Sequence, residues 1–479
     1  MNVPRLVRSC AGGLMILATL LLSRTHAADV IDRAKVDKLA APLTESGWVY
    51  GLAIGLINEQ GTQTLSYGHT SESNPAPPTP ETLFEIGSIT KVFTGTILAQ
   101  LVEEGKLSLD DPAQQHLGTT MFVPKGKERQ ITLKDLSTHS SGLPRMPSNF
   151  SPKDPSNPYA DYTVAQMGAF LMKHKLQRQP GEKSEYSNLG VGLLGHVLQL
   201  KSGFDYESLV EAKIGGPLGM SHTRITLDDA DREHLAIGHD YDGQPVANWD
   251  LPTLAGAGAI RSTTGDMLKF LAAQLGLQKS ALDAAIAKSH EVHFKNPEDA
   301  DSDVGLGWML NRKDGVIWHN GGTGGYSSFA GFQPEKKFGV VVLANTSTRF
   351  ADQLGLKLLK LMGGEEVEPL EVPAVVALAS EKLEPLVGKY KLTEALVANV
   401  TREGDRLFVQ LTGQPKIGIY ATSETNFYCR PVDAKFDFEL DDSGQAARMM
   451  IHQNGLDLPA TRVDPAAEPA AGATKTPAG

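Results

Sequence analysis

The 479-residue sequence is poor in cysteine, in net positive charge and in long apolar runs. Its two cysteines, Cys10 and Cys429, are too few for a disulfide scaffold, so a large hydrophobic core must stabilise the chain. The 56 acidic residues outnumber the 45 basic ones and give a net charge of −11, which argues against a nucleic-acid partner. After residue 27, no apolar run is long enough to cross a bilayer, so we expect no membrane span in that part of the chain.

Two motifs of well-known hydrolases are also missing. The chain has no Gly-x-Ser-x-Gly, which argues against an α/β-hydrolase, and no His-Glu-x-x-His of a zinc protease. His234 and His239 lie five residues apart, but no third ligand accompanies them. We therefore predict neither a metal site nor a cofactor.

Residues 1–27 have the pattern of a secretory signal peptide. Arg5 and Arg8 precede an apolar run over residues 11–22, and Thr25-His26-Ala27 places small residues where a signal peptidase cleaves. The alternative is a membrane anchor, but this run is too short to cross about 30 Å of hydrocarbon as a helix. We therefore predict a secreted, periplasmic protein.

Hydrophobic periodicity predicts a chain of mixed helices and strands. Its continuous apolar runs are typical of buried strands, and apolar residues spaced by one, three and four are typical of helices. Strands are predicted at 49–57, 62–67, 317–318 and 339–344, and helices at 90–104 and 189–200.

The composition and the hydrophobic pattern of the sequence change near residue 365. Residues 365–380 begin with an acidic, proline-bearing stretch and are predicted to be a linker between a domain at 28–364 and a second domain at 381–463. Short alternating runs, separated by turns at intervals of roughly ten residues, predict a small all-β barrel or sandwich there. These runs are 390–392, 398–401, 407–411, 427–430 and 436–440. The Ala/Pro-rich residues 464–479 are expected to be a disordered tail.

The first candidate motif is Ser88-Ile89-Thr90-Lys91, at the start of the predicted helix 90–104. Main-chain N–H groups at a helix start favour negative charge, and Lys91 lies one turn beyond Ser88 on the same face. Burial would lower the pKa of Lys91 and let it accept the Ser88 proton. The alternative is a capped helix with a solvated lysine.

The second candidate motif is Tyr186-Ser187-Asn188. A phenol near a lysine can relay a proton to a leaving group, which makes Tyr186 a candidate catalytic residue. The Asn188 amide can donate a hydrogen bond to a substrate carbonyl and accept one from a lysine. The alternative is a tyrosine on a surface loop.

The third candidate motif is His319-Asn320-Gly321-Gly322, directly after the apolar pair Ile317-Trp318. Glycines at a strand end let a substrate backbone lie along the strand. The Gly322 N–H could face the Ser88 N–H and form an oxyanion hole. The alternative is a glycine-rich hairpin turn with a chance histidine.

In this order, the three motifs resemble those of the penicillin-recognising serine hydrolases, which include class C β-lactamases, D-Ala-D-Ala carboxypeptidases and β-lactamase-like carboxylesterases. The stretch Leu136-Ser137-Thr138-His139-Ser140-Ser141-Gly142-Leu143-Pro144 also resembles a loop of that family. The resemblance covers roughly residues 30–362. It implies an α+β fold: an antiparallel sheet flanked by helices, plus a helical lobe, followed here by a lipocalin-like barrel.

The resemblance also implies a function. Ser88, Lys91 and Tyr186 would be catalytic, and Asn188, His319, Gly321 and Gly322 would bind the substrate. The expected activity is acyl transfer through Ser88 on D-Ala-ended peptides, small esters or β-lactams. Two alternatives stay open: an efficient class C-like β-lactamase, and a sensor that is acylated once by penicillin and never turns over.

Two residues depart from the family's β-lactamases. His319 stands where those enzymes usually carry a lysine, and an imidazole with an ordinary pKa of about 6.5 would hold a carboxylate weakly and in a pH-dependent way. Thr90 replaces a small Ser or Ala. Both differences favour a peptide or an ester over a β-lactam as the substrate.

Three further residues are assigned structural roles. We expect His139 to order its loop, and Arg145 and Arg261 to make surface or structural pairs, with binding of a substrate carboxylate as the alternative for both arginines. The sequence leaves open whether the C-terminal barrel covers the active site or only stabilises the chain, and whether the protein forms oligomers.

Overall fold

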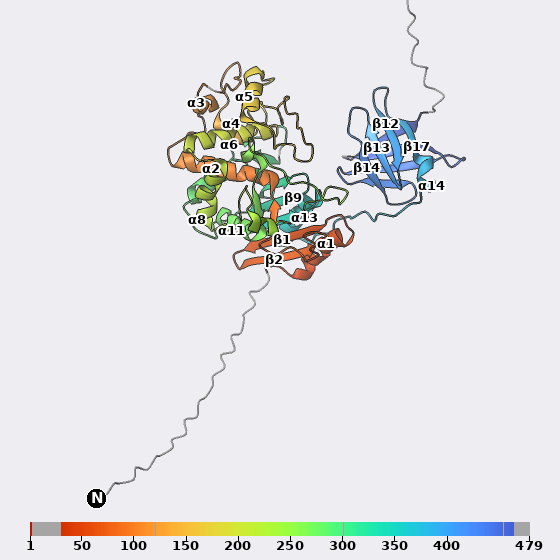
Figure 1. The fold of residues 1–479 in the computed structure, drawn as a ribbon, viewed down its shortest axis with the longest axis horizontal. Helices are drawn as coiled ribbons and strands as arrows, with labels where there is room; N and C mark the ends of the chain where they lie inside the picture. Colours follow the sequence, from red (N-terminus) through yellow and green to blue (C-terminus); the bar gives the residue numbers. More distant parts are fainter. Residues whose placement is uncertain (2–29, 120, 300, 454, 464–479) are drawn as a thin grey trace, which may run out of the picture.

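The computed structural model describes Met1 and residues 30–119, 121–299, 301–453 and 455–463. A sheet with helices extends to Met362, and a closed barrel of strands extends from Gly388 to Arg462 (Figure 1). Nearly all of the predicted signal peptide and the whole of the predicted tail lie outside the described residues. No helix of the described part is long and apolar enough to cross a membrane.

The N-terminal part is built on one eight-stranded antiparallel sheet with the order β2-β1-β10-β9-β8-β7-β6-β5. The four predicted strands are confirmed as β1, β2, β8 and β10. The strands of this sheet are β1 (Gly51–Asn58), β2 (Gly61–Gly68), β5 (Phe294–Lys295), β6 (Ser302–Val304), β7 (Met309–Asn311), β8 (Ile317–Gly322), β9 (Ser327–Gln333) and β10 (Phe338–Ala344). A second, two-stranded sheet pairs β3 (Leu83–Glu85) with β4 (Arg261–Thr263).

Helices cover both faces of the sheet and also form a separate lobe that contains α3, α4, α5 and α6 (Figure 1). Both predicted helices are confirmed, as α2 and α6. The helices of this part are α1 (Arg33–Glu45), α2 (Thr90–Glu103), α3 (Ala113–Leu117), α4 (Leu133–Ser137), α5 (Val164–Lys173), α6 (Asn188–Ser202), α7 (Tyr206–Val210), α8 (Gly216–Leu218), α9 (Asp229–His234), α10 (Ala255–Gly258), α11 (Thr264–Gln274), α12 (Asp283–His290) and α13 (Phe350–Met362), with a 3₁₀ turn η1 (Gly87–Ile89) and a π turn η2 (Glu211–Gly215).

Strand β1 explains why the central strands read as continuous apolar runs. Leu52 and Ile54 pack into one core cluster with residues of α1 and α13, whereas Ala53 and Ile57 pack into another with residues of α2 and α11. Alternate side chains of a strand point to opposite faces, so a sheet covered on both faces needs apolar residues at every position.

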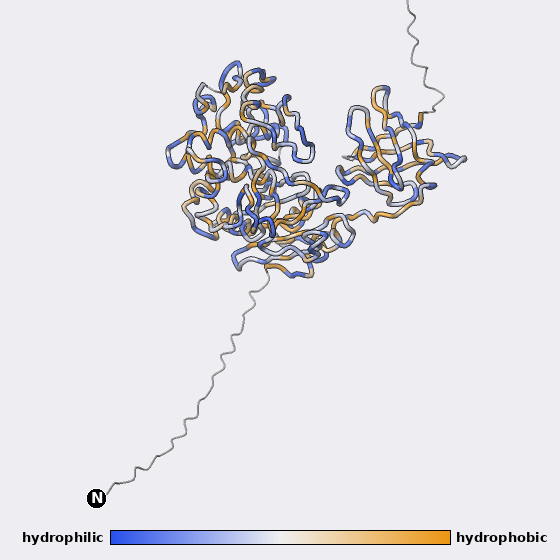
Figure 2. Tube along the Cα trace, in the orientation of Figure 1, coloured by the Kyte–Doolittle hydropathy of each residue, from blue (hydrophilic) through white to orange (hydrophobic). Residues whose placement is uncertain are grey.

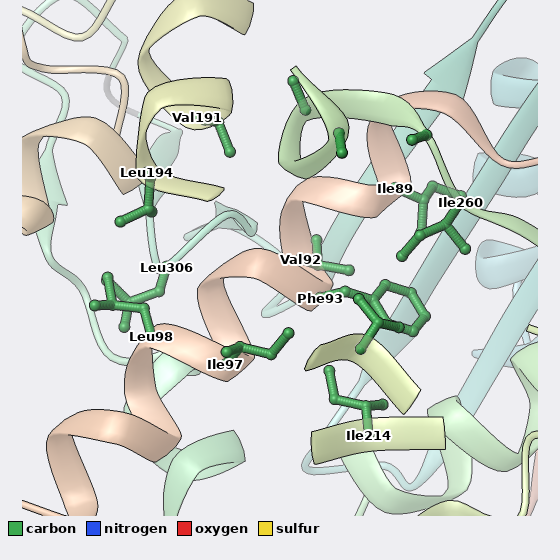
Figure 3. Packing of buried hydrophobic residues seen from close by; sticks show 14 of the residues in the cluster. Ile89, Val92, Phe93, Ile97, Leu98, Val191, Leu194, Ile214, Ile260 and Leu306 are labelled. Atoms are coloured by element: carbon green, nitrogen blue, oxygen red, sulfur yellow. The ribbon is translucent and has the colours of Figure 1, made fainter. Parts of the chain in front are cut away.

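Helix α2 is the buried axis of the N-terminal part (Figure 3). Phe93 stacks on Phe270 of α11 with ring centroids 4.3 Å apart. At Gly95, a Cβ atom would lie 2.1 Å from the Leu306 carbonyl oxygen, so only glycine allows this approach. Packing on all sides therefore fixes α2, which carries Lys91 and directly follows the turn that contains Ser88.

The C-terminal part is a closed barrel of eight strands, which confirms the predicted small β-barrel. Apolar and polar residues alternate along its strands (Figure 2), and the inward-facing side chains form one core that includes Tyr390, Phe436 and Met449. The barrel is preceded by α14 (Ser380–Leu383) and a 3₁₀ turn η3 (Glu384–Leu386). Its strands are β11 (Gly388–Lys391), β12 (Val397–Glu403), β13 (Arg406–Leu411), β14 (Ile417–Ala421), β15 (Asn426–Cys429), β16 (Ala434–Leu440), β17 (Ala446–Gln453) and β18 (Leu456–Arg462).

The barrel contacts the N-terminal part through aromatic and charged side chains. The Trp48 ring lies 5.1 Å from the Tyr428 ring, and the Arg430 guanidinium lies 4.4 Å from the Trp48 ring. Arg406 forms an ion pair of 2.6 Å with Asp242. These contacts join the barrel to the entry of β1 and to the turn that contains Asp242.

Candidate active site

Ser88 lies in the 3₁₀ turn η1, immediately before α2, and its side chain is half-buried. The preceding Gly87 has a φ of +48°, and a Cβ atom there would lie 2.8 Å from the Gly322 nitrogen. Glycine is therefore required at this position, both for the backbone conformation and for the close approach of β8. The same approach brings the end of the third motif against the Ser88 turn.

Lys91 lies one turn beyond Ser88 and is fully buried. Its Nζ lies 2.9 Å from the Ser88 Oγ and donates a hydrogen bond of 2.7 Å to the Ala257 carbonyl oxygen. Burial holds the pKa of Lys91 well below its ordinary value, and the positive charge of Arg145 lowers it further. The amine is thereby poised to be neutral and to accept the Ser88 proton.

Tyr186 lies in the loop before α6, above the Ser88–Lys91 pair. Its ring centroid is 4.7 Å from the Lys91 Nζ, and its hydroxyl is within hydrogen-bonding reach of Ser88. Burial raises the pKa of Tyr186 to about 12, although Ser88 and the Arg145 charge oppose this shift. The phenol therefore keeps its proton at neutral pH and can donate it.

A second loop, residues 138–145, holds the Tyr186 motif in place. The Ser187 N–H donates to the His139 Nδ1 at 3.2 Å, and the Ser187 hydroxyl donates to the Pro144 carbonyl oxygen at 2.7 Å. The His139 ring lies 4.5 Å from the Tyr186 ring, between centroids. His139 thus orders its loop and also supports one side of Tyr186.

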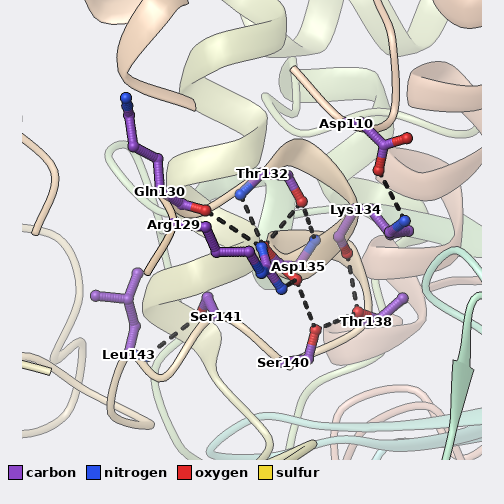
Figure 4. Close-up of polar contacts among 10 residues, drawn as sticks. All are labelled: Asp110, Arg129, Gln130, Thr132, Lys134, Asp135, Thr138, Ser140, Ser141 and Leu143. Carbon is purple, nitrogen blue, oxygen red and sulfur yellow. Dashed lines mark hydrogen bonds and ion pairs between the residues drawn. The ribbon is translucent and has the colours of Figure 1, made fainter. Parts of the chain in front are cut away.

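That loop is anchored in turn by the buried carboxylate of Asp135 on α4 (Figure 4). Asp135 accepts hydrogen bonds from both terminal nitrogens of Arg129, at 2.6 and 2.9 Å, and one from the Ser140 hydroxyl at 3.2 Å. Thr132 and Asp135 also form a capping box at the start of α4. These hydrogen bonds to a buried carboxylate fix the loop.

The third motif lies on β8, at the sheet side of the site. A Cβ atom on Gly321 would lie 2.0 Å from the Ile86 carbonyl oxygen, so β8 could not approach the Ser88 turn with any other residue there. This contact brings Gly322 beside Gly87. The arrangement suits an oxyanion hole made of the Ser88 and Gly322 N–H groups.

His319 is buried and neutral. Its Nδ1 lies 2.5 Å from the Asn320 carbonyl oxygen, which assigns the ring proton to Nδ1 and leaves a lone pair on Nε2. The Nε2 atom is buried and has no hydrogen-bond partner among the described residues. Burial and the nearby Lys91 lower the pKa of His319 to about 3, so the ordinary pKa assumed from the sequence is wrong here.

Asn188 begins α6 beside Tyr186. Its Nδ2 contacts the Met146 sulfur at 3.9 Å, and its Oδ1 is buried without a hydrogen-bond partner among the described residues. An amide oxygen in this state can accept a hydrogen bond from a ligand or from Lys91. Asn188 therefore has capacity left for a substrate.

The structure brings six of the seven candidate residues into direct contacts or close approach around Ser88, with Asn188 joined to them through the Tyr186 loop. Arg261 lies elsewhere: its buried guanidinium pairs with Glu85 at 3.2 Å and with Asp250 at 3.0 Å, as expected for a structural pair. The sequence interpretation missed that Arg145 lies over the Tyr186 ring. Its position six residues after His139, which was expected to order the loop, gave no sign of this contact.

Comparison with known proteins settles the family. A model described as Beta-lactamase matches residues 36–361, which is more than half of the chain. The chain belongs to the beta-lactamase family. A second model, described as a domain of unknown function (DUF3471), matches residues 372–470. The protein is therefore a serine hydrolase of the penicillin-recognising type with an additional C-terminal barrel.

Relatives and solved structures of this family resemble the chain at moderate identity. The D-alanyl-D-alanine-carboxypeptidase/endopeptidase AmpH of Escherichia coli (strain K12) is 29% identical over 386 residues, covering 75% of this chain and 97% of the relative. A beta-lactamase/D-alanine carboxypeptidase of Yersinia pestis, solved with citrate, is 27% identical with a TM-score of 0.61, covering 69% of this chain and 97% of that one. A D-alanine carboxypeptidase of Burkholderia cenocepacia is also 27% identical, with a TM-score of 0.60, covering 69% of this chain and 98% of that one.

Proposed function

We propose that this protein is a secreted hydrolase that forms an acyl-enzyme on Ser88 and acts on D-Ala-ended peptides or small esters. The observation that carries the proposal is the 2.9 Å contact between the Ser88 Oγ and the fully buried Lys91 Nζ. The carboxypeptidase names of the relatives support a peptide substrate. The N-terminal pattern of residues 1–27 supports secretion, and the ranges of the two family models support separate domains at 28–364 and 381–463.

Acylation begins with proton transfer. Neutral Lys91 takes the proton of the Ser88 hydroxyl as Oγ attacks the substrate carbonyl, and the Ser88 and Gly322 N–H groups stabilise the oxyanion. Tyr186, which is protonated at neutral pH, gives its proton to the leaving amine or alcohol and recovers one from Lys91. The carbonyl–leaving-group bond breaks, and the acyl group remains on Ser88 until water hydrolyses it.

Binding groups surround the reacting carbonyl. Asn188 has a free amide oxygen for a substrate N–H, and the His319 Nε2 lone pair can accept a second N–H. Gly321 and Gly322 leave room for an extended substrate along β8. These groups suit a peptide, which presents several N–H donors.

Efficient β-lactamase activity is the less favoured function, because His319 supplies no positive charge. A neutral imidazole with a lone pair on Nε2 repels a carboxylate instead of binding it. We therefore expect penicillin to acylate Ser88 slowly, and the resulting acyl-enzyme to be hydrolysed slowly.

The test is intact-mass measurement during incubation with a penicillin, a D-Ala-D-Ala peptide and a short-chain ester. We expect a penicillin adduct that maps to Ser88, together with hydrolysis of the peptide or the ester. Rapid return to the free mass with hydrolysed penicillin would establish a β-lactamase instead. An adduct without turnover of any substrate would establish a sensor, and no adduct and no turnover would contradict the proposal.

A further inference from the structure

The active site contains a positive charge outside the three motifs. The exposed Arg145 follows Pro144 in the helical lobe, and its guanidinium carbon lies 5.0 Å from the centroid of the Tyr186 ring. Its carbonyl oxygen accepts hydrogen bonds from the N–H groups of Asn188 and Leu189, at 3.1 and 3.2 Å. The backbone that carries this charge is therefore tied directly to the start of α6.

This guanidinium differs from three other arginines of the N-terminal part. Arg129 is paired with Asp135, Arg178 with Glu185, and Arg261 with Glu85. For Arg145, the described residues provide no ion-pair partner. Its charge nevertheless acts across the site, because it lowers the pKa of Lys91 and of Tyr186.

On the sheet side of the site, the third motif presents a hydrogen-bond acceptor and no positive charge. The buried His319 uses its Nδ1 proton on the Asn320 carbonyl oxygen and presents only a lone pair at Nε2. A carboxylate has no proton to donate to that lone pair, so the two groups would repel each other. A substrate carboxylate therefore has to find its donors elsewhere in this site.

We infer that Arg145 binds a carboxylate of the substrate, so that the anion-binding group of this site lies on the helical lobe and not on β8. This inference rests on the proposed function. A guanidinium presents several N–H donors in a planar fork that matches a carboxylate. Near Arg145, Tyr159 provides an aromatic surface, with its ring 5.3 Å from Trp249 and 5.1 Å from Phe150. The positive charge of Arg145 also acts on the Tyr159 hydroxyl, where it opposes the rise of the pKa that burial causes.

Two positions in a D-Ala-D-Ala peptide can supply that carboxylate: the C-terminus, or an acidic side chain on the acyl side of the scissile bond. The test uses four peptides, with a free carboxylate or an amide at each position. Their affinities for Ser88→Ala and for Ser88→Ala/Arg145→Gln are measured by calorimetry, so that turnover does not interfere. We expect Ser88→Ala to prefer a carboxylate at one position by roughly tenfold to a hundredfold, and Arg145→Gln to abolish that preference.

Two control variants separate this role from a general charge effect. Lys153→Gln removes an exposed positive charge from the following loop and should keep the preference, and Arg145→Lys should keep part of it. The preference should also decrease as salt is added. Equal affinity of Ser88→Ala for all four peptides would overturn the inference, and so would a preference that survives Arg145→Gln. Failure of the proposed function would show separately, as absence of acylation and turnover in the wild-type protein.

Discussion

The N-terminal part buries ionisable side chains, whereas the barrel buries apolar ones. Among the described residues, the buried polar and charged side chains extend from Thr82 to Ser347, and the barrel core contains aliphatic and aromatic residues with one cysteine. Burying an ionisable group costs free energy, so a chain keeps it where chemistry needs it. The comparison agrees with chemistry in the N-terminal part, and we expect the barrel to have a stabilising role.

The sharpest test of this comparison replaces one lysine in each part by methionine. Lys91→Met should lower kcat/KM by about a hundredfold to ten-thousandfold, because the base that accepts the Ser88 proton is lost. The midpoint of thermal unfolding should stay or rise, because an apolar side chain of similar length replaces a buried amine. Both quantities are measured on purified protein, by steady-state kinetics and by thermal denaturation.

Lys435→Met, at an exposed position of β16, is the matched control and should leave both quantities unchanged. A Lys91→Met protein with normal kcat/KM would remove the basis for placing proton transfer at this residue. A large loss of stability would show instead that Lys91 mainly supports the fold.

A second pair of variants compares the two cores. Phe93→Ala and Phe436→Ala each remove a buried ring, and each should lower the free energy of unfolding by about 3–5 kcal/mol. Phe93 lies on α2 next to Lys91, so its loss should also lower kcat/KM, whereas the loss of Phe436 should not. Chemical denaturation and kinetics on the folded fraction measure the two effects. Equal losses of activity would contradict the division of roles.

Much of the N-terminal part could be predicted from the sequence because its signals are local. Ser88 and Lys91 are one helical turn apart, and the apolar spacing of α2 is regular. The environment of His319 could not be predicted, because its burial and its contact with the Asn320 carbonyl depend on how β8 meets the Ser88 turn. The Arg145–Tyr186 contact joins residues about forty positions apart and is likewise a product of the fold.

Fewer of the barrel's strands could be predicted from the sequence. Strands β14, β17 and β18 were not predicted, and β18 contains Pro459, which cannot donate a ladder hydrogen bond. Pro459 pairs with Met450 of β17, while β18 meets β11 only at Thr461 and Arg462. The proline is therefore tolerated where one side of the strand has no paired neighbour.

The pH dependence of stability should have opposite signs in the two parts. The folded-state pKa of Lys91 lies below its unfolded value, so the folded protein binds fewer protons and its stability rises with pH up to about 10.5. On the barrel, Asp457 and Asp437 raise the pKa of His452 above 6.5, so its stabilisation is present at lower pH and lost as pH rises through the folded pKa.

Urea denaturation from pH 5 to pH 9 measures both slopes. Relative to wild type, Lys91→Met should lose the rise of stability with pH, and His452→Gln should lose a smaller fall, because His452 is partly solvated. Identical pH profiles for wild type and Lys91→Met would show that Lys91 is not perturbed by burial.

The smallest expected effect lies where the two parts meet. Asp242 pairs with Arg406 and also accepts a hydrogen bond from Tyr420, both on the barrel. Its turn follows His239, whose N–H donates to the Gly325 carbonyl oxygen in the connection between β8 and β9. A chain of contacts therefore connects the barrel to the connection that follows β8, the strand with His319.

Asp242→Asn weakens this connection without removing a large side chain. We expect the free energy of unfolding to fall by about 1 kcal/mol or less, because the pair is partly exposed, and kcat/KM to stay within about twofold. Asp405→Asn, an exposed change at the β12–β13 turn, is the control for surface charge. A change in kcat/KM with the peptide but not with the ester would contradict the purely stabilising role of the barrel. It would mean that the barrel adjusts the substrate-binding side of β8, because the serine chemistry is common to both substrates.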